Sequence, residues 1–378
     1  GCARVGEEKF GLLNLCTDEH ICPKEITKCL KELGRIHGKS LEIQSFRTRS
    51  DMGEGDLQQQ EFWQQWAREG VRTILVMMPY SPEKQRVRSG ALRAGIATQF
   101  FTPKDLNQYK AFNIVLGLLC KAKWQPIHLQ PHSEWAELII GFDAGTNRSL
   151  YFGTPAFAIL ANGQSLGWEL PSVQRGEKIS GEALWQTVCK LVGKFKQYHS
   201  EKRYPKKVLL LRDGLARQDE FQRTIDELGK MNIAVDLLSV RKTGAGRLAQ
   251  KIENDPQKIE NDPQKIENDQ YAAAPKGTVV FEEQERSFIL ISSQPIKSRG
   301  KELGSARPLR VVHEYGKTSL EQLAIQTYHL TQLHPGSAFS HARLPWVLHL
   351  AHRLSQEFSR LPSLDLVATL DRDKLIGV

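Results

Sequence analysis

The chain has 378 residues, of which 40% are hydrophobic and 25% are charged; this balance is typical of a globular protein and excludes wholesale disorder. No apolar run approaches the ~20 residues that a membrane-spanning helix needs, and no signal peptide is visible. Lys and Arg number 52 against 43 Asp and Glu, and the resulting net charge of +9 favours a polyanionic partner.

The first part of the chain alternates between helical and strand patterns. A buried strand is predicted at 73–79, and helices are predicted at 57–69, 81–95 and 104–123. Alternation at this spacing predicts an α/β layer with a mostly parallel sheet.

A change of pattern near 130–134, where Pro131 and His132 interrupt the chain, marks a domain boundary. We therefore expect one domain at 1–133 and a second at 134–378. The second domain has predicted strands at 138–142, 156–160, 207–211, 234–240, 278–282, 288–292 and 309–313, and predicted helices at 181–198, 218–231, 320–333 and 345–360. This order predicts a mixed sheet covered by helices.

The six cysteines form no CxxC pair and no cysteine–histidine block with zinc spacing. Cys120 and Cys189 lie within apolar helical patterns, where a thiol packs as a small hydrophobic group. We therefore expect a cytoplasmic protein whose cysteines are reduced.

A low-complexity repeat occupies residues 251–269, where KIENDPQ occurs twice and continues as KIEND. Its period is seven, but only Ile is apolar and two units contain Pro, so a coiled coil is excluded. We interpret it as a solvated expansion of a surface loop. It carries a net charge of −3, which leaves +12 for the rest of the chain.

Two aspartates follow buried strands. Asp143 comes after ELIIGF and Asp213 after VLLLR. If these strands are neighbours, both carboxylates meet at one edge of the sheet, where divalent cations would neutralise them. The competing interpretation is that each aspartate only begins a turn before glycine, and either motif alone favours it.

The segment QRGEKISGEALW offers a further carboxylate. Ser180 occupies the N-cap position of a helix, so Glu182 is explained as a first-turn residue. Glu177 has no such explanation and lies in a Gly-flanked loop. Near the C-terminus, His349 and His352 lie three residues apart on one helix, and their spacing does not decide which could reach a metal.

Polar residues of the first domain suit a phosphate. Tyr80 and Lys84 lie at the start of a helix that follows a strand, and helix N-termini attract anions. Gln99 and Lys121 could complete such a pocket. The competing interpretation is that these side chains are ordinary solvated surface.

Together and in order, these motifs resemble the MID and PIWI domains of prokaryotic Argonaute proteins of the long bacterial type. The resemblance covers most of the chain and is strongest in GFDAG, WELPSVQRGEKI, VLLLRDG, VDLLSVRKTGAGR, HLTQLHPGS and RLPWVLHLAHRL. It implies an α/β fold in which a Rossmann-like MID domain precedes an RNase H-like PIWI domain.

The resemblance also implies a catalytic tetrad. Asp143 and Asp213 match its aspartates, Glu177 its mobile glutamate and His352 its variable fourth ligand. Close bacterial relatives often have Asp at the fourth position, so His352 could alter metal preference. Two Mg²⁺ or Mn²⁺ ions are implied at this site, with Asp143, Asp213 and His352 as ligands.

The resemblance assigns the guide's 5′-phosphate to the first domain. Tyr80, Lys84, Gln99 and Lys121 match the residues that hold it, and the terminal carboxylate of Val378 matches one that binds a further metal ion there. Arg241, Lys242 and Arg247, in VRKTGAGR, are candidates for contacts with the nucleic-acid backbone; a solvated loop is the competing interpretation.

The implied function is a guide-directed endonuclease that holds a 5′-phosphorylated guide, with DNA favoured for guide and target. We expect the protein to be a monomer and to have no membrane as a partner. The alternative is a module that binds guide and target without cleavage. Relatives carry N and PAZ domains ahead of MID, and this chain begins with Gly1 rather than Met. Because all four tetrad positions are chemically competent, we expect the C-terminal half of a longer protein rather than a naturally short form.

Overall fold

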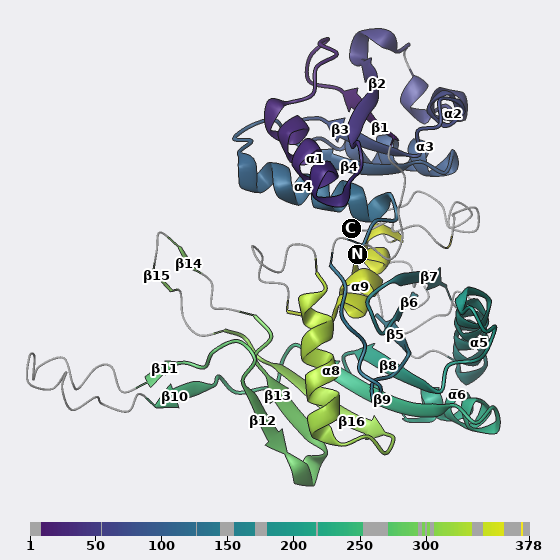
Figure 1. Cartoon of the computed structure of the whole chain (residues 1–378), viewed down its shortest axis with the longest axis vertical. Helices are drawn as coiled ribbons and strands as arrows, with labels where there is room; N and C mark the ends of the chain where they lie inside the picture. Colours follow the sequence, from purple (N-terminus) through teal and green to yellow (C-terminus); the bar gives the residue numbers. More distant parts are fainter. Residues whose placement is uncertain are drawn as a thin grey trace, which may run out of the picture.

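The frame of the protein consists of two separate β-sheets, each with helices on both faces (Figure 1). The computed structural model describes residues 9–53, 55–125, 127–143, 155–170, 180–216, 218–251, 271–293, 297–298, 301–302, 306–334, 343–358 and 372.

The first sheet is parallel throughout, with strand order β2-β1-β3-β4. Its strands are β1 (Lys9–Asn14), β2 (Glu42–Thr48), β3 (Thr73–Met77) and β4 (Ala97–Phe101). The helices are α1 (Lys24–His37), α2 (Gln60–Arg68), α3 (Glu83–Arg93) and α4 (Gln108–Lys121), with short 3₁₀ turns at Arg49–Asp51 and Asp56–Gln58. Helices α1 and α4 cover one face, while α2 and α3 cover the other.

The second sheet is mixed and has the order β12-β13-β16-β9-β8-β5-β6-β7. Strands β5, β8 and β9 are parallel, and their neighbours on both sides are antiparallel. The bounds are β5 (Leu138–Phe142), β6 (Ala156–Leu160), β7 (Ser165–Glu169), β8 (Lys207–Asp213), β9 (Ala234–Arg241), β12 (Val279–Glu282), β13 (Ser287–Leu290) and β16 (Leu309–Tyr315), with a 3₁₀ turn at Glu283–Glu285.

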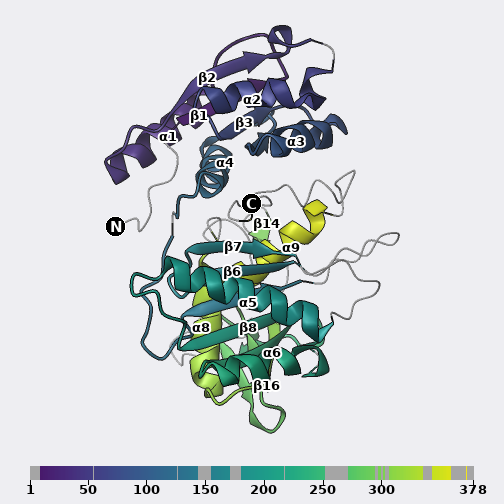
Figure 2. The ribbon, with the colours of Figure 1, turned by 90° about the vertical axis from the view of Figure 1, so that its right-hand side faces the viewer.

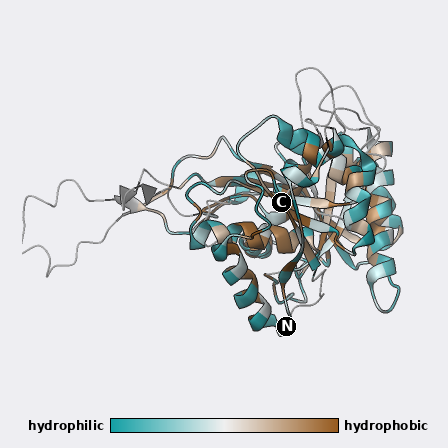
Figure 3. Ribbon diagram, turned by 90° about the horizontal axis from the view of Figure 1, so that it is seen from above, coloured by the Kyte–Doolittle hydropathy of each residue, from teal (hydrophilic) through white to brown (hydrophobic). Residues whose placement is uncertain are grey.

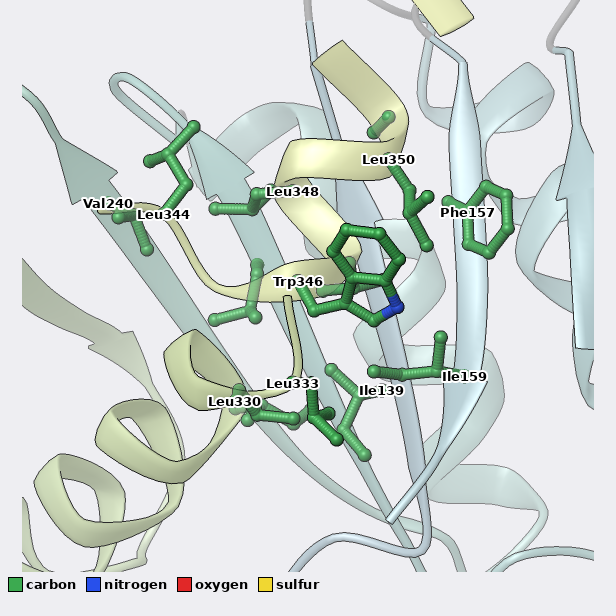
Figure 4. Packing of buried hydrophobic residues seen from close by; sticks show 14 of the residues in the cluster. Ile139, Phe157, Ile159, Val240, Leu330, Leu333, Leu344, Trp346, Leu348 and Leu350 are labelled. Carbon is green, nitrogen blue, oxygen red and sulfur yellow. The ribbon is translucent and has the colours of Figure 1, made fainter. Parts of the chain in front are cut away.

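Two pairs of helices enclose this sheet and divide its core. Helices α5 (Gly181–Tyr198) and α6 (Gln218–Lys230) pack on one face, and α8 (Leu320–Gln332) and α9 (Trp346–Phe358) pack on the other. In Figure 4, Trp346 and Leu350 of α9 lie beside Ile139, Ile159 and Phe157 of the sheet. Figure 3 shows the apolar strands gathered inside and the polar helix surfaces outside.

The KIENDPQ repeat joins two paired strands. β10 (Ala249–Lys251) pairs antiparallel with β11 (Tyr271–Ala273), so that Lys251 lies opposite Tyr271. The residues between these strands, and with them the predicted solvated loop, lie outside the described residues. A second hairpin joins β14 (Lys297–Ser298) and β15 (Lys301–Glu302).

Cys120 is buried in α4, as predicted, but the interpretation of Cys189 as a packed apolar group was wrong, because its side chain is exposed on α5. The buried positions of α5 run from Ala183 to Phe195 at helical spacing, and Cys189 lies beside that stripe. Among the described residues every cysteine is a free thiol.

The connection between the sheets runs from Lys121 to Leu138, and the boundary predicted at 133/134 lies within it. Figure 2 shows α9 between the two sheets, next to α3 and α4. Leu92 and Cys120 of the first domain belong to the same apolar cluster as α9. Within the described part of the chain, no helix has the length and apolar character needed to cross a membrane.

Candidate metal centre and phosphate pocket

Two aspartates lie side by side at the carboxyl ends of adjacent parallel strands. In the pairing of β5 with β8, Phe142 lies opposite Arg212, so Asp143 and Asp213 are the next residues on each strand. Both side chains are largely buried, with 9% and 8% of their surface exposed. The strand pairing therefore brings together the two carboxylates that the sequence placed at strand ends.

His352 completes a cluster of three side chains that could hold a metal ion, which we call the metal-ligand cluster. It projects from α9, and its Nδ1 lies 3.1 Å from Oδ2 of Asp143. One ligand atom from each of Asp143, Asp213 and His352 lies within 4.8 Å of the others. The imidazole is 35% exposed, whereas the two aspartates are largely buried.

Gln356 fixes the other side of the imidazole and was missed by sequence reasoning. Its Nε2 lies 2.9 Å from Nε2 of His352, one helical turn earlier. Because an amide offers both a donor and an acceptor, Gln356 can partner either tautomer of the ring. The i, i+4 spacing was visible in the sequence, but nothing there marked Gln356 as a partner.

The pKa values of the two aspartates move in opposite directions. Burial favours the neutral form of Asp143, yet the hydrogen bond and charge of His352, together with the charge of Lys242, lower its pKa. The pKa of Asp213 is raised, because burial and the neighbouring Asp143 outweigh the contact with Lys242. Two carboxylates that repel in this way are suited to holding a cation.

The structure places Lys242 at the metal-ligand cluster. Its Nζ lies 2.5 Å from Oδ2 of Asp213. The neighbouring Arg241 instead lies 3.6 Å from a carboxylate oxygen of Glu314. Arg247, the third candidate for nucleic-acid contacts, is exposed.

The two glutamates of the QRGEKISGEALW segment have different outcomes. Ser180 accepts a hydrogen bond from the backbone N–H of Ala183, which confirms it as the N-cap of α5. Glu182 pairs with Arg223 and accepts a hydrogen bond from Gln186, so its carboxylate has structural partners. Glu177 lies outside the described residues.

His349 occupies a different environment from His352. Its ring packs edge-on against His334, with centroids 4.5 Å apart, and stacks on Trp346. Burial lowers the pKa of His349 to about 3 and that of His334 to about 4, with nearby positive charge contributing. Both histidine rings therefore pack around Trp346.

Three of the predicted phosphate-binding residues lie around β4. Nζ of Lys121 donates to Oε1 of Gln99 over 2.6 Å, and Nζ of Lys84 lies 5.0 Å from the centroid of Phe100. Lys121 is almost fully buried, and burial, followed by the positive charge of Arg88, lowers its pKa well below the usual value. A buried cation surrounded by others is suited to a multiply charged anion.

The remaining phosphate candidates are not gathered in the same way. Tyr80 is fully exposed, and Val378 lies outside the described residues. Sequence reasoning missed Arg88, whose guanidinium lies 5.1 Å from the Phe100 ring and pairs with Glu357 of α9. No local pattern marks Arg88 and Glu357 as partners, since they are 269 residues apart.

Comparison with known proteins shows the family to which the chain belongs. The family profile of the Piwi domain matches residues 74–361. The protein argonaute of Synechococcus elongatus is 53% identical over 383 residues, covering the whole chain and 50% of that protein. The protein argonaute of Thermus thermophilus is 33% identical over 382 residues, covering the whole chain and 51% of that protein. The chain therefore spans about half the length of the curated relatives it matches.

Solved structures show the same fold at low identity. Clostridium butyricum Argonaute, bound to a guide DNA and a 19-mer target DNA, matches with a TM-score of 0.75 and 18% identity over 99% of this chain and 50% of that one. Aquifex aeolicus Argonaute matches with a TM-score of 0.61 and 18% identity over 98% and 51%. The α/β fold is thus a Rossmann-like MID domain followed by an RNase H-like PIWI domain. The chain belongs to the Piwi-domain family, among the prokaryotic Argonautes.

Proposed function

We propose that this chain is a guide-directed endonuclease that holds a 5′-phosphorylated guide and hydrolyses the complementary target strand, both of them DNA. The observation that carries the proposal is the cluster of Asp143, Asp213 and His352, with ligand atoms within 4.8 Å of one another. The guide DNA and target DNA in the Clostridium butyricum structure support the choice of DNA.

The donor set fits a divalent ion. Carboxylate oxygens suit Mg²⁺ and Mn²⁺, and an imidazole nitrogen favours Mn²⁺ over Mg²⁺. Two such ions, when bound, activate a water molecule and stabilise the leaving 3′-oxygen. We assign Asp143, Asp213 and His352 as ligands and Glu177 as the fourth member of the tetrad.

The side chains around the cluster prepare it for this chemistry. His352 lowers the pKa of Asp143, and its ring would offer a lone pair to a metal ion when the ring proton lies on the nitrogen that faces Gln356. Lys242 balances the charge of Asp213. Each of the two neighbouring carboxylates is thus stabilised by one partner, Asp213 by Lys242 and Asp143 by His352.

The MID domain, which we assign to residues 1–133, supplies the guide pocket. Lys84 and Lys121 provide charge, Gln99 orients Lys121, and the N-terminus of α3 adds backbone N–H groups. Tyr80 and the carboxylate of Val378, which would hold a third metal ion, complete the proposed set. The PIWI domain, 134–378, then carries the cleavage site.

The test is a matrix of DNA and RNA guides and targets, each incubated with Mg²⁺ or Mn²⁺. We expect target cleavage with a 5′-phosphorylated DNA guide on a DNA target, and no product from the Asp143→Ala/Asp213→Ala variant. Product that persists in this double variant would contradict the assignment of the site.

One observation favours the alternative of binding without cleavage. The ammonium of Lys242 already contacts Asp213, and it competes with a metal ion for that carboxylate. Filter binding of guide and target without cleavage, at every divalent ion concentration tested, would select this alternative.

A further inference from the structure

Helix α9 contacts both domains: most of it packs on the second sheet, and its last described turn contacts α3 of the first domain. Near its start, Val347 packs so closely on β5 that a Cβ at Gly141 would lie 3.0 Å from it. Leu350, Ala351 and Leu354 are buried in the core of the second sheet. The last described turn instead carries Glu357, which pairs with Arg88 of α3.

The Arg88–Glu357 pair is buried at the contact between the domains. The two side chains are only 9% and 8% exposed. The guanidinium also lies over Phe100 beside Lys84, at the phosphate pocket. A buried ion pair is a poor source of stability compared with apolar packing, but it specifies one geometry, because either charge alone is costly.

Glu357 shares its helix with a metal ligand. His352 lies five residues earlier, about 7.5 Å along the axis, and Gln356, which contacts the His352 ring, is the residue next to Glu357. A shift or rotation of this end of α9 would therefore move both His352 and its partner away from Asp143.

We infer that the Arg88–Glu357 ion pair is a positioning device, which fixes α9 so that His352 lies against Asp143 and thereby ties the metal-ligand cluster to the MID domain. The inference rests on the proposed metal site. It adds Arg88 and Glu357 as residues that act on the metal through His352 without touching it.

The test is a double-mutant cycle on Mn²⁺ affinity, measured by calorimetry on the full chain without nucleic acid. Glu357→Gln should weaken Mn²⁺ binding about tenfold, the usual effect of losing an outer-shell partner. In the His352→Ala background the same change should have less than about a twofold effect, because positioning acts through His352. Arg88→Met, which breaks the pair from the other helix, should give the same pattern.

Glu137→Gln is the matched control. Glu137 precedes β5 at the end opposite Asp143 and forms a two-pronged ion pair with Arg203, with contacts of 2.6 and 2.9 Å. Its loss removes a two-pronged but more exposed ion pair, with side chains 30% and 29% exposed, and should leave Mn²⁺ affinity unchanged.

Two results would overturn the inference: unchanged affinity in Glu357→Gln, or equal losses with and without His352, which a general structural role would give. The proposed metal site fails separately, since Mn²⁺ binding that is insensitive to Asp143→Asn would show that the ion binds elsewhere.

Discussion

The ammonium of Lys242 lies 2.5 Å from Oδ2 of Asp213, and Nδ1 of His352 lies 3.1 Å from Oδ2 of the neighbouring Asp143. Each aspartate thus has a protein partner of its own. Since a cation at this distance both neutralises the carboxylate and repels a divalent ion, Lys242 sets how strongly the cluster attracts metal.

Replacing Lys242 should therefore tighten metal binding. We expect Lys242→Met to bind Mn²⁺ about tenfold more tightly, because a nearby positive charge is removed from a largely buried site. Without added metal the variant should unfold at a lower temperature, since two carboxylates then lack that counter-charge. Calorimetry and thermal melts with EDTA or Mn²⁺ measure both effects. Arg241→Met, which loses the same charge from the neighbouring residue, is the control; equal tightening in both variants would contradict a local role for Lys242.

The two glutamates near α5 should differ sharply in their effect on cleavage. Glu177→Gln should reduce the cleavage rate by about 10³-fold, since metal-assisted stabilisation of the transition state amounts to several kcal/mol. Glu182→Gln should retain cleavage, because its carboxylate pairs with Arg223 on the helix surface. Single-turnover assays with saturating guide compare them. A large loss in Glu182→Gln with none in Glu177→Gln would reverse the assignment.

Lys84 and Lys121 of the first domain should favour a guide with a 5′-phosphate over one with a 5′-hydroxyl. Lys84→Ala combined with Lys121→Ala should weaken binding of a 5′-phosphorylated guide much more than binding of a 5′-hydroxyl guide, by about tenfold or more. Lys104→Ala combined with Lys110→Ala, which removes two exposed lysines of the same domain, serves as the charge-matched control. Filter binding at several salt concentrations gives the affinities, which should fall steeply with salt. Equal losses for both guide ends would place the phosphate site elsewhere.

Acid should destabilise the protein through His334 and His349. Their folded-state pKa values, about 4 and about 3, lie below the ordinary value of 6.5. Below pH 6.5 the unfolded chain therefore takes up protons that the folded chain excludes, and the free energy of unfolding falls as the pH decreases toward 4. At pH 4.5 each histidine should account for about 2–3 kcal/mol.

Urea unfolding of His349→Phe at pH 7 and pH 4.5 checks this expectation. The difference in unfolding free energy between the two pH values should be smaller than in the parent chain. His132→Phe, which changes an exposed ring, should leave that difference as it is. A pH dependence that His349→Phe does not reduce would mean that other groups cause the acid sensitivity.

The strands that place the two aspartates were predictable because they are buried on both faces and consist of unbroken apolar runs. Strand β2 was not predicted, since its residues alternate irregularly between exposed and half-buried positions. β1, β4 and β7 were also missed. Each mixes polar or glycine residues with its apolar ones, in KFGLLN, ATQFF and SLGWE, so none stands out as an apolar run.

Long-range partners lay beyond sequence reasoning. The local pattern around His349 and His352 did not choose between them; only the resemblance favoured His352, and the structure shows it beside Asp143. The contact between Lys242 and Asp213 was not predicted, because a basic loop carries no sign of the carboxylate that it meets in the fold; its contact with nucleic acid stays a prediction. The pairing of Arg88 with Glu357 likewise depends on how two domains pack.

The hairpin of β10 and β11 allows the segment between its two strands to vary in length. Because Lys251 and Tyr271 face each other across a paired ladder, the intervening segment starts and ends at the same place whatever its length. Doubling such a connection costs only about 0.6 kcal/mol in closure entropy. Copies of the seven-residue unit can therefore be gained or lost by slippage during DNA replication without shifting the register of any strand, which makes this hairpin a natural insertion point for a label or a tether.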